Sequence, residues 1–319
     1  MKAWIRRLTV TFTSTKLRKK LIFGENYKNN LPELDIEVSG CKYLSALKDN
    51  CVIKIKNIGY PEIIQLIDGE YYDVEVKAGY KYGNFETIFK GGVLYITNSL
   101  DISKSNTVII SCASNLIAKY GQKRINLSLN SGINMYSAVN FVLRRAGIRD
   151  VSVSQQLKKK MLQDIKNVSS SPGSFIEDIC NTNNSFCSSV DSILGNTLTI
   201  FDTNKSNLRV IPINSENINL SGGYPQLNKD GLRISIMPTF SFMPGDIIKI
   251  DNSIIDISTI INRTENINYS ELIKGSLFNE NGMYMIYEIN YVLQNRGPNF
   301  TFNLICKNRD LVSKLTQGV

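Results

Sequence analysis

The segment IRRLTVTF, residues 5–12, decides the fold class because apolar and polar side chains alternate along it. Leu8, Val10 and Phe12 would share one face of an extended strand, with threonines between them on the other face. Successive side chains of a strand point to opposite faces, so the pattern predicts a strand with one buried face.

Segments of the same texture follow along the first third of the chain. They are rich in Ile, Val, Tyr and Thr, and Gly, Asn, Asp or Pro stands in the gaps between them. Short strands at this spacing predict a β-barrel or β-sandwich over residues 1–113. After the first strand, the expected strands are residues 35–38, 51–57, 71–78, 93–97 and 107–112.

Helical patterns replace strands in the next part of the chain. A helix is predicted over residues 134–146, where apolar side chains fall near one face and Gly147 stands at the C-cap position. A second helix is predicted over residues 174–181, with Ser174 as its N-cap. Between them, residues 155–165 are expected to form a short helix or a loop.

Strands return after the second helix. Residues 189–194 and 197–201 predict a hairpin with Gly195-Asn196 as its two-residue turn. Residues 114–206 are therefore expected to form a small α+β domain.

The sequence of the last third of the chain is again typical of strands, and residues 295–298 are predicted to be the loop of a final hairpin. A second all-β domain is expected over residues 207–319. The predicted fold is mainly β with a small α+β part, in which two β-barrel-like domains flank the α+β middle domain. The expected strands are residues 208–212, 233–237, 247–250, 254–257, 282–293 and 300–306.

Length and composition are those of a globular protein with several domains. A chain of 319 residues exceeds the usual size of one domain, and 42% hydrophobic with 20% charged residues is ordinary usage. No apolar run approaches the roughly 20 residues of a membrane-spanning helix. Threonines and a serine interrupt the basic residues 1–20 before a signal-peptide core can form, so synthesis in the cytoplasm is expected.

The six cysteines have no CxxC spacing, which argues against a zinc site and against a disulfide framework. We expect buried, reduced thiols. They are Cys41, Cys51, Cys112, Cys180, Cys187 and Cys306.

The chain contains no histidine. It therefore cannot form a Ser-His-Asp or Cys-His nucleophilic arrangement, a histidine general base or a His-containing zinc site.

Paired carboxylates could still hydrolyse a glycoside without histidine. The candidate pairs are Glu70 with Asp73 and Glu177 with Asp178, at a hairpin and in a short helix where solvated polar residues are common. Other carboxylates recur every five residues, at 246, 251 and 256, unlike the ligand spacing of a calcium loop. No catalytic, metal or cofactor-binding residue is predicted, and no cofactor.

A formal charge of +9 raises the question of nucleic-acid binding. The dense basic clusters are Arg6-Arg7, residues 16–20 and residues 158–160, and none is interleaved with aromatic residues as a base-stacking platform would be. Solvated surface residues are the commoner explanation of such clusters.

Three segments, in order, resemble the baseplate hub proteins of tailed bacteriophages, the group with the tail-hub and late-control proteins. The first is VEVKAGY, residues 74–80, continuing to ETIFKGGV, residues 86–93. The second is residues 125–147 with residues 175–201, which look like the helical part and hairpin of the family's middle domain.

The glycines at 79, 83, 91 and 92 lack the order of a phosphate loop, so we expect them to serve turns or close packing instead.

The third segment runs from GGYP at residues 222–225 to residue 250, and a closing hairpin at residues 282–307 matches the family's final barrel. No appended peptidase, lysozyme or spike domain is recognised, so those activities are not carried over. The positions that carry the resemblance are Gly79, Tyr80, Phe89, Gly91, Gly223, Pro225, Gly231, Pro238, Pro244, Gly245 and Asp246.

The resemblance implies a non-enzymatic structural virion protein. Three subunits, each with two tube-like barrels, would form a pseudo-sixfold ring that adapts a hexameric tail tube to a trimeric central spike and lines the genome channel. The implied partners are two further copies of the chain, the tail tube protein, the central spike protein, other baseplate proteins and genome DNA that passes without specific binding. The implied location is the baseplate of the virion tail, assembled in the host cytoplasm.

Two other functions stay open on the sequence. One is a carboxylate-dependent cell-wall hydrolase of the tail tip, and the other is a nucleic-acid-binding module that uses the positive charge.

Overall fold

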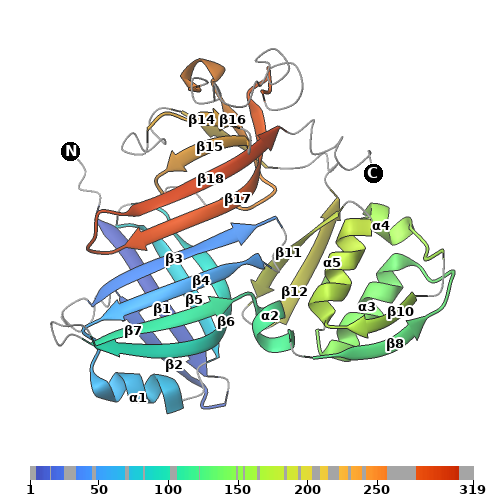
Figure 1. The fold of residues 1–319 in the computed structure, drawn as a ribbon, viewed down its shortest axis with the longest axis horizontal. Coiled ribbons are helices and arrows are strands. Elements are labelled where there is room, and N and C mark those ends of the chain that lie inside the picture. Colours follow the sequence, from blue (N-terminus) through green and yellow to red (C-terminus); the bar gives the residue numbers. More distant parts are fainter. Residues whose placement is uncertain are drawn as a thin grey trace, which may run out of the picture.

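A computed structural model gives the fold. It describes residues 5–14, 16–24, 34–44, 48–68, 72–81, 83–100, 106–121, 123–148, 150–153, 155–163, 166–182, 185–192, 195–202, 209–214, 223–228, 231–238, 242–256 and 278–308. One 13-stranded sheet dominates the described part of the chain, beside a smaller region that holds most of the helices (Figure 1).

The first β lobe comprises seven strands from the first part of the chain and the helix α1 (Tyr60–Asp68). In β1 every second residue from Leu8 to Ser14 is buried, so the alternation at residues 5–12 correctly predicts a strand. The helix α1 was not predicted, although Ile63 and Leu66 are buried at helical spacing. In sheet order the strands are β2 (Lys19–Gly24), β1 (Arg6–Ser14), β5 (Asp73–Tyr80), β6 (Phe85–Leu100), β7 (Asn106–Ala113), β4 (Asn50–Lys56) and β3 (Asp35–Tyr43).

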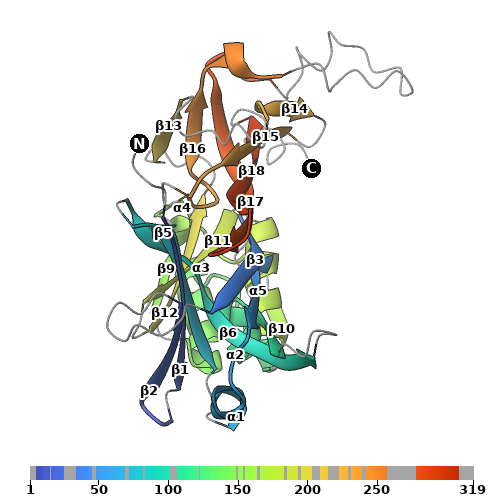
Figure 2. The ribbon, with the colours of Figure 1, turned by 90° about the vertical axis from the view of Figure 1, so that its left-hand side faces the viewer.

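The second β lobe comprises six strands from the last part of the chain, and it lies above the first lobe in Figures 1 and 2. The predicted strand at residues 254–257 is wrong in its described part, because Asn252–Ile254 form a 3-10 turn capped by Asp251. The strands are β13 (Val210–Ile213), β14 (Gln226–Asn228), β15 (Gly231–Ile236), β16 (Ile247–Ile250), β17 (Met283–Gln294) and β18 (Phe300–Asn308).

The two lobes share one sheet and one apolar core. β17 pairs with β18 along most of its length, with β16 at its start and with β3 over its last seven residues. Buried side chains from both lobes form a single contiguous cluster, from Leu8 to Cys306. The mainly β fold is confirmed, but the described strands close no barrel, and two separate barrels and the boundaries near residues 113 and 206 stay predictions.

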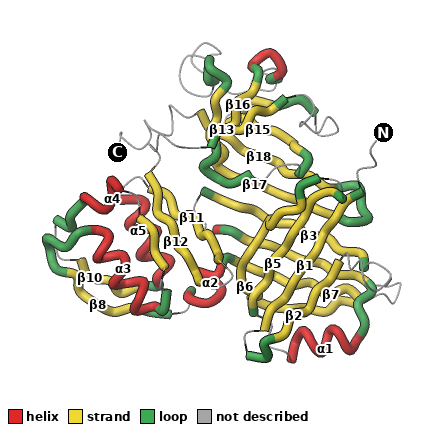
Figure 3. The backbone as a smooth tube through the Cα atoms, turned by 180° about the vertical axis from the view of Figure 1, so that it is seen from behind, coloured by secondary structure: helices red, strands yellow, loops and turns green. Residues whose placement is uncertain are grey.

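The middle region has a core of its own, which gathers buried side chains between Ile125 and Cys180. Its small sheets pair β8 (Ile125–Leu129) with β10 (Lys166–Ser170), and β12 (Gly195–Asp202) with β9 (Asp150–Val153) and β11 (Ser185–Ser192). Figure 3 shows the region beside the large sheet. Its helices are α2 (Asn115–Tyr120), α3 (Met135–Ala146), α4 (Gln155–Lys159) and α5 (Pro172–Thr182).

Helix α3 is the best-predicted element of the middle region. The Asn134 side chain accepts a hydrogen bond from the backbone of Ser137, and Gly147 ends the helix with φ of 95°. A left-handed residue at this position satisfies the last carbonyl groups, and glycine adopts it without a Cβ clash.

Two details of the middle region were predicted wrongly. The backbone N–H of Ser174 donates to the Ser171 hydroxyl, so Ser171 takes the capping role, because Pro172 can occupy the first helical turn. Gly195 and Asn196 pair with Ser192 and Asp191 as members of β12, so they do not form the hairpin turn. No helix among the described residues has the length and apolarity needed to cross a membrane.

Candidate assembly site at the junction of the lobes

The junction between β3 and β17 makes the two lobes one sheet. Seven residue pairs form its antiparallel ladder, from Tyr43 opposite Glu288 to Glu37 opposite Gln294. Tyr291 lies opposite Gly40, and a Cβ at Gly40 would approach the Tyr291 hydroxyl to 2.5 Å. Glycine at this position therefore lets the tyrosine ring lie directly on β3.

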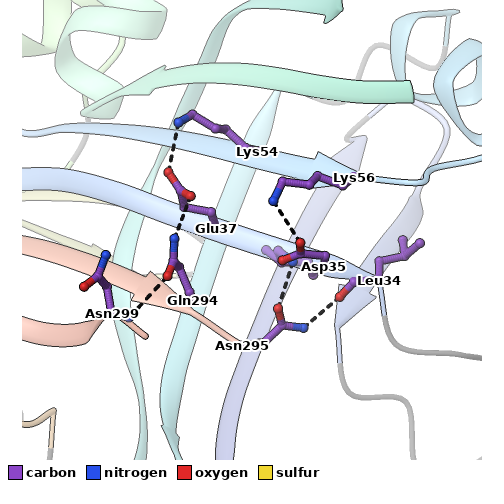
Figure 4. Close-up of polar contacts among 9 residues, drawn as sticks. Leu34, Asp35, Glu37, Lys54, Lys56, Gln294, Asn295 and Asn299 are labelled. Carbon is purple, nitrogen blue, oxygen red and sulfur yellow. Dashed lines mark hydrogen bonds and ion pairs between the residues drawn. The ribbon is translucent and has the colours of Figure 1, made fainter. Parts of the chain in front are cut away.

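Glu37 is the centre of a polar network across the junction (Figure 4). One carboxylate oxygen accepts from the Lys54 ammonium at 2.9 Å, and the other accepts from the Gln294 amide at 2.8 Å. The carbonyl of the same amide accepts from the backbone of Asn299 at 3.2 Å. The network therefore links β4, β3, β17 and the loop between β17 and β18.

The pKa of Glu37 is lowered from its ordinary value, mainly by the hydrogen bond from Lys54, although burial opposes this. The charged carboxylate is thus the form that the junction favours.

Asn295 ties the loop after β17 to the start of β3. Its side-chain oxygen accepts from the backbone N–H of Ile36 at 2.8 Å, and its side-chain nitrogen donates to the carbonyl of Leu34 at 2.7 Å. Beside it, Lys56 and Asp35 form an ion pair at 2.9 Å.

A second contact between the lobes surrounds Tyr80, one of the positions that carry the family resemblance. Its ring packs edge-on against Phe300 of β18, with 5.4 Å between ring centroids. The Arg6 guanidinium lies 5.3 Å from the centre of the same Phe300 ring and donates to the carbonyls of Gly297 and Pro298. The predicted Gly-Tyr segment is therefore part of the junction.

Gly79 and Gly91 allow close packing inside the first lobe. A Cβ at Gly79 would meet the Asn84 carbonyl at 1.9 Å, and one at Gly91 would meet the Ala113 carbonyl at 2.2 Å and the Phe89 ring at 2.6 Å. β6 exchanges β5 for β7 as its partner at the next residue, Gly92. The glycines thus let β6 turn from one half of the lobe into the other.

Residues 243–246 form a β-turn in the second lobe. The Asp246 N–H donates to the Met243 carbonyl at 3.0 Å, and Gly245 has φ of 95°, as a type II turn requires after Pro244. The Asp246 carboxylate pairs with Arg209 and accepts from the backbone of Met243. The Asp246 side chain therefore stabilises this turn and ties it to Arg209.

The other family positions also lie at turns or buried sites of the second lobe. Gly231 has φ of 124° beside the Cys306 carbonyl, and Gly223 has φ of 85° in an open turn. The carbonyl of Pro225 accepts a hydrogen bond from the backbone N–H of Asp256 at 2.7 Å, and Pro238 is buried. The structure does not gather these positions with Tyr80 into one site.

The candidate acid pairs receive no support from the geometry. Glu177 and Asp178 are exposed on α5, and Glu70 lies outside the described residues. No cluster that could hold a metal ion occurs among the residues that the structure describes. Cys51, Cys112, Cys180 and Cys306 are buried free thiols, Cys41 is half-buried, and the Cys187 side chain is not described.

Sequence reasoning missed the junction residues Glu37, Gln294 and Asn295. Charged and amide residues at strand ends are ordinary, and no local pattern identifies a partner more than 250 positions away, as in the Gln294–Glu37 contact.

Known structures share this fold. The 43 kDa tail protein of prophage MuSo2 from Shewanella oneidensis matches with a TM-score of 0.60 at 9% identity, over 96% of this chain and 98% of that one. A tail protein from Neisseria meningitidis matches with a TM-score of 0.56 at 9% identity, over 95% and 96% of the two chains.

A secretion protein shares it as well. The Escherichia coli c3393 protein, a type VI secretion component described as similar to the T4 tail proteins gp27 and gp5, has a TM-score of 0.54 at 10% identity over 88% of this chain and 75% of that one. No family model matches the sequence, and no curated protein sequence matches it either. The resemblance to tail proteins inferred from sequence is thus confirmed as a likeness of fold.

Proposed function

We propose that this chain is a baseplate hub protein of a phage tail. The observation that carries the proposal is the likeness of fold to phage tail proteins over nearly the full length of both chains. In this proposal the protein is a structural component of the virion and acts through its interfaces.

The proposed assembly is a homotrimer. Each subunit contributes two β lobes, so three subunits place six lobes around a three-fold axis, which suits a hexameric tube on one side and a trimeric spike on the other. The β3–β17 junction supports this role because the continuous ladder joins the two lobes of a subunit into one sheet. Genome DNA would pass through the central channel without specific binding.

The partners proposed are the tail tube protein, the central spike protein and other baseplate proteins. The similar E. coli protein is described as resembling both gp27 and gp5, and another similar structure is a VgrG protein in complex with PdpA from Francisella. These relatives support a chain that works in contact with other tail or spike components.

The outer edge of β2 is the contact that we assign to a neighbouring subunit. Among the described strands, β2 pairs only with β1, and Ile22 on it is 53% exposed. An unpaired strand edge with an exposed apolar side chain is a ready partner for another strand.

Mass photometry and native mass spectrometry of the purified chain test the proposal. We expect a species of three times the monomer mass, and particle images with six lobes around a channel. Ile22→Lys should lower the trimer fraction, whereas Ile117→Lys, the same change at a 40% exposed position on α2, should not.

A chain that stays monomeric at micromolar concentration, even with tube and spike proteins added, would contradict the hub. Release of soluble sugar from host envelope that is lost in Glu177→Gln would instead support the hydrolase. An intact trimer in Ile22→Lys would reject the β2 contact alone.

A further inference from the structure

The middle region carries most of the excess positive charge of the chain. Residues 114–182 contain ten Lys and Arg against four Asp and Glu, a net charge of +6, out of +9 for the whole sequence. The charge is therefore concentrated on a part of the molecule that lies beside the large sheet (Figures 1 and 3).

Helix α3 exposes aromatic residues on its outer side. Its inner side buries Ala138, Val139 and Val142 in the middle core, whereas Tyr136 is 36% exposed and Phe141 is 47% exposed. The core does not need these two rings, and each leaves apolar surface in contact with water. Their exposure therefore calls for an explanation outside the core.

Each exposed ring has a cation beside it. The Lys158 ammonium of α4 lies 5.2 Å from the centre of the Tyr136 ring, and the Arg145 guanidinium lies 5.6 Å from the centre of the Phe141 ring. Contacts of this kind restrict the cation while leaving its N–H donors available. The pairs thus hold two positive charges in place at opposite ends of α3.

Other exposed groups fill the space around these pairs. Arg144 is exposed on α3 about one turn after Phe141, and Met161, 56% exposed, follows α4 and pairs with Asn134 at the start of α3. A helix of 12 residues is ~18 Å long, enough for one side of a peptide or a helix of a partner. We call Tyr136, Phe141, Arg144, Arg145, Lys158 and Met161 the α3 face.

We propose that the α3 face is a docking surface for the acidic surface of another protein. Its carboxylates would accept from Arg144, Arg145 and Lys158, and its apolar side chains would cover the two rings and Met161. The proposal does not depend on the ring of subunits, since no strand of the two β lobes contributes to this face.

The composition favours a protein over nucleic acid. Tyr, Phe, Met and Arg are the residues enriched at the centres of protein interfaces. A phosphate backbone requires cations but leaves Met161 and the ring edges uncovered, and the rings already have cations at one side.

A fluorescein-labelled copolymer of glutamate and tyrosine is the probe, and its binding to the full-length chain is followed by fluorescence anisotropy at several salt concentrations. The triple variant Arg144→Gln, Arg145→Gln, Lys158→Gln should weaken binding about tenfold, as the loss of three exposed ion pairs would. The matched control is Lys20→Gln, Lys48→Gln, Lys249→Gln, which removes the same charge elsewhere on the surface. It should change the affinity for the copolymer less than about twofold.

The double variant Tyr136→Ala, Phe141→Ala separates docking from simple charge attraction. This variant keeps every cation, so we expect it to bind more weakly than the unmodified chain. The difference in affinity should remain at high salt, where the charge contribution is screened. Thermal unfolding of each variant should match that of the unmodified chain, because all the substituted side chains are exposed.

Three results would overturn the proposal. The first is an equal loss of affinity for the copolymer in the triple variant and in its matched control. The second is an aromatic double variant that binds the copolymer like the unmodified chain at every salt concentration. The third is a labelled DNA oligonucleotide that binds more tightly than the copolymer and is lost in the same variants, which would assign the face to nucleic acid.

Discussion

The hydroxyl of Tyr291 donates a hydrogen bond of 3.1 Å to the main-chain carbonyl of Asn50, 241 residues away in the sequence. The ring starts on β17, passes over Gly40 of β3 and reaches β4. One side chain of the second lobe thereby contacts two successive strands of the first. Because Tyr291 is also buried, this contact ties the register of the junction to its packing.

Tyr291→Phe should lower the free energy of unfolding by about 1 kcal/mol, since it removes the hydrogen bond and keeps the ring. Urea unfolding followed by circular dichroism measures the change. Tyr224→Phe, at a 64% exposed position, is the matched control and should leave the midpoint unchanged. Equal midpoints for Tyr291→Phe and the unmodified chain would show that the bond contributes nothing.

Gly40→Ala should be more harmful, with a loss of about 3 kcal/mol or more. The added Cβ would lie 2.3 Å from the Asn50 carbonyl and 2.5 Å from the Tyr291 hydroxyl. Gly83→Ala is the control, because its Cβ would only touch Tyr80 at 3.6 Å. Adding Tyr291→Leu to Gly40→Ala should recover only part of the loss, since the backbone carbonyl stays. Full recovery would mean that the ring alone causes the clash.

The strands themselves were predictable because their signals are local. Leu8, Val10 and Phe12 alternate with polar residues, and a strand that buries one face must have this pattern. Helix α3 was predictable for the same reason, since Asn134 and Gly147 mark its ends within one short segment.

The joining of the lobes was not predictable from the residues. Pairing between β3 and β17 joins segments about 250 positions apart. Alternation of apolar and polar residues fixes which face of a strand is buried, but it does not identify the neighbouring strand. Lys42 illustrates the limit: it follows Ile36, Val38 and Gly40 on the core-facing side of β3, where the pattern would demand an apolar residue.

Lys42→Met should stabilise the isolated chain by about 1 kcal/mol. Lys42 lines a small pocket with Phe242, Ile289 and Phe302, and burial lowers its pKa from the ordinary value of 10.5. The folded state therefore binds this proton less tightly than the unfolded chain does. At pH values below the folded pKa, the charged Lys42 lowers the free energy of unfolding.

That destabilisation has a testable dependence on pH. It shrinks as the pH rises towards 10.5, so the advantage of Lys42→Met should narrow over the same range. Lys20→Met, at an exposed position, is the control in urea unfolding at each pH. A Lys42→Met protein that is less stable than the unmodified chain at neutral pH would contradict the prediction.

The buried thiols should resist labelling in the folded protein. Burial raises the pKa of Cys51 and of Cys180 to about 12, so almost no reactive thiolate is present at pH 8. In a Cys187→Ser background, maleimide should modify only the half-buried Cys41 at a measurable rate, and Cys41→Ser should abolish this reaction. Complete labelling in urea is the positive control, and rapid labelling of several thiols in the folded chain would contradict the burial.

Acid should weaken the junction through Glu37. Its folded pKa lies below the ordinary value of 4.5, so the folded state binds this proton less tightly than the unfolded chain does. The resulting stability is fully present above 4.5 and is lost as the pH falls through the folded pKa. Glu37→Gln removes the charge that Lys54 and Gln294 contact, so its free energy of unfolding should fall less between pH 7 and pH 3.5 than that of the unmodified chain. Glu177→Gln, exposed on α5 and remote from the junction, should retain the full dependence; if both variants respond to acid alike, Glu37 does not stabilise the junction through its charge.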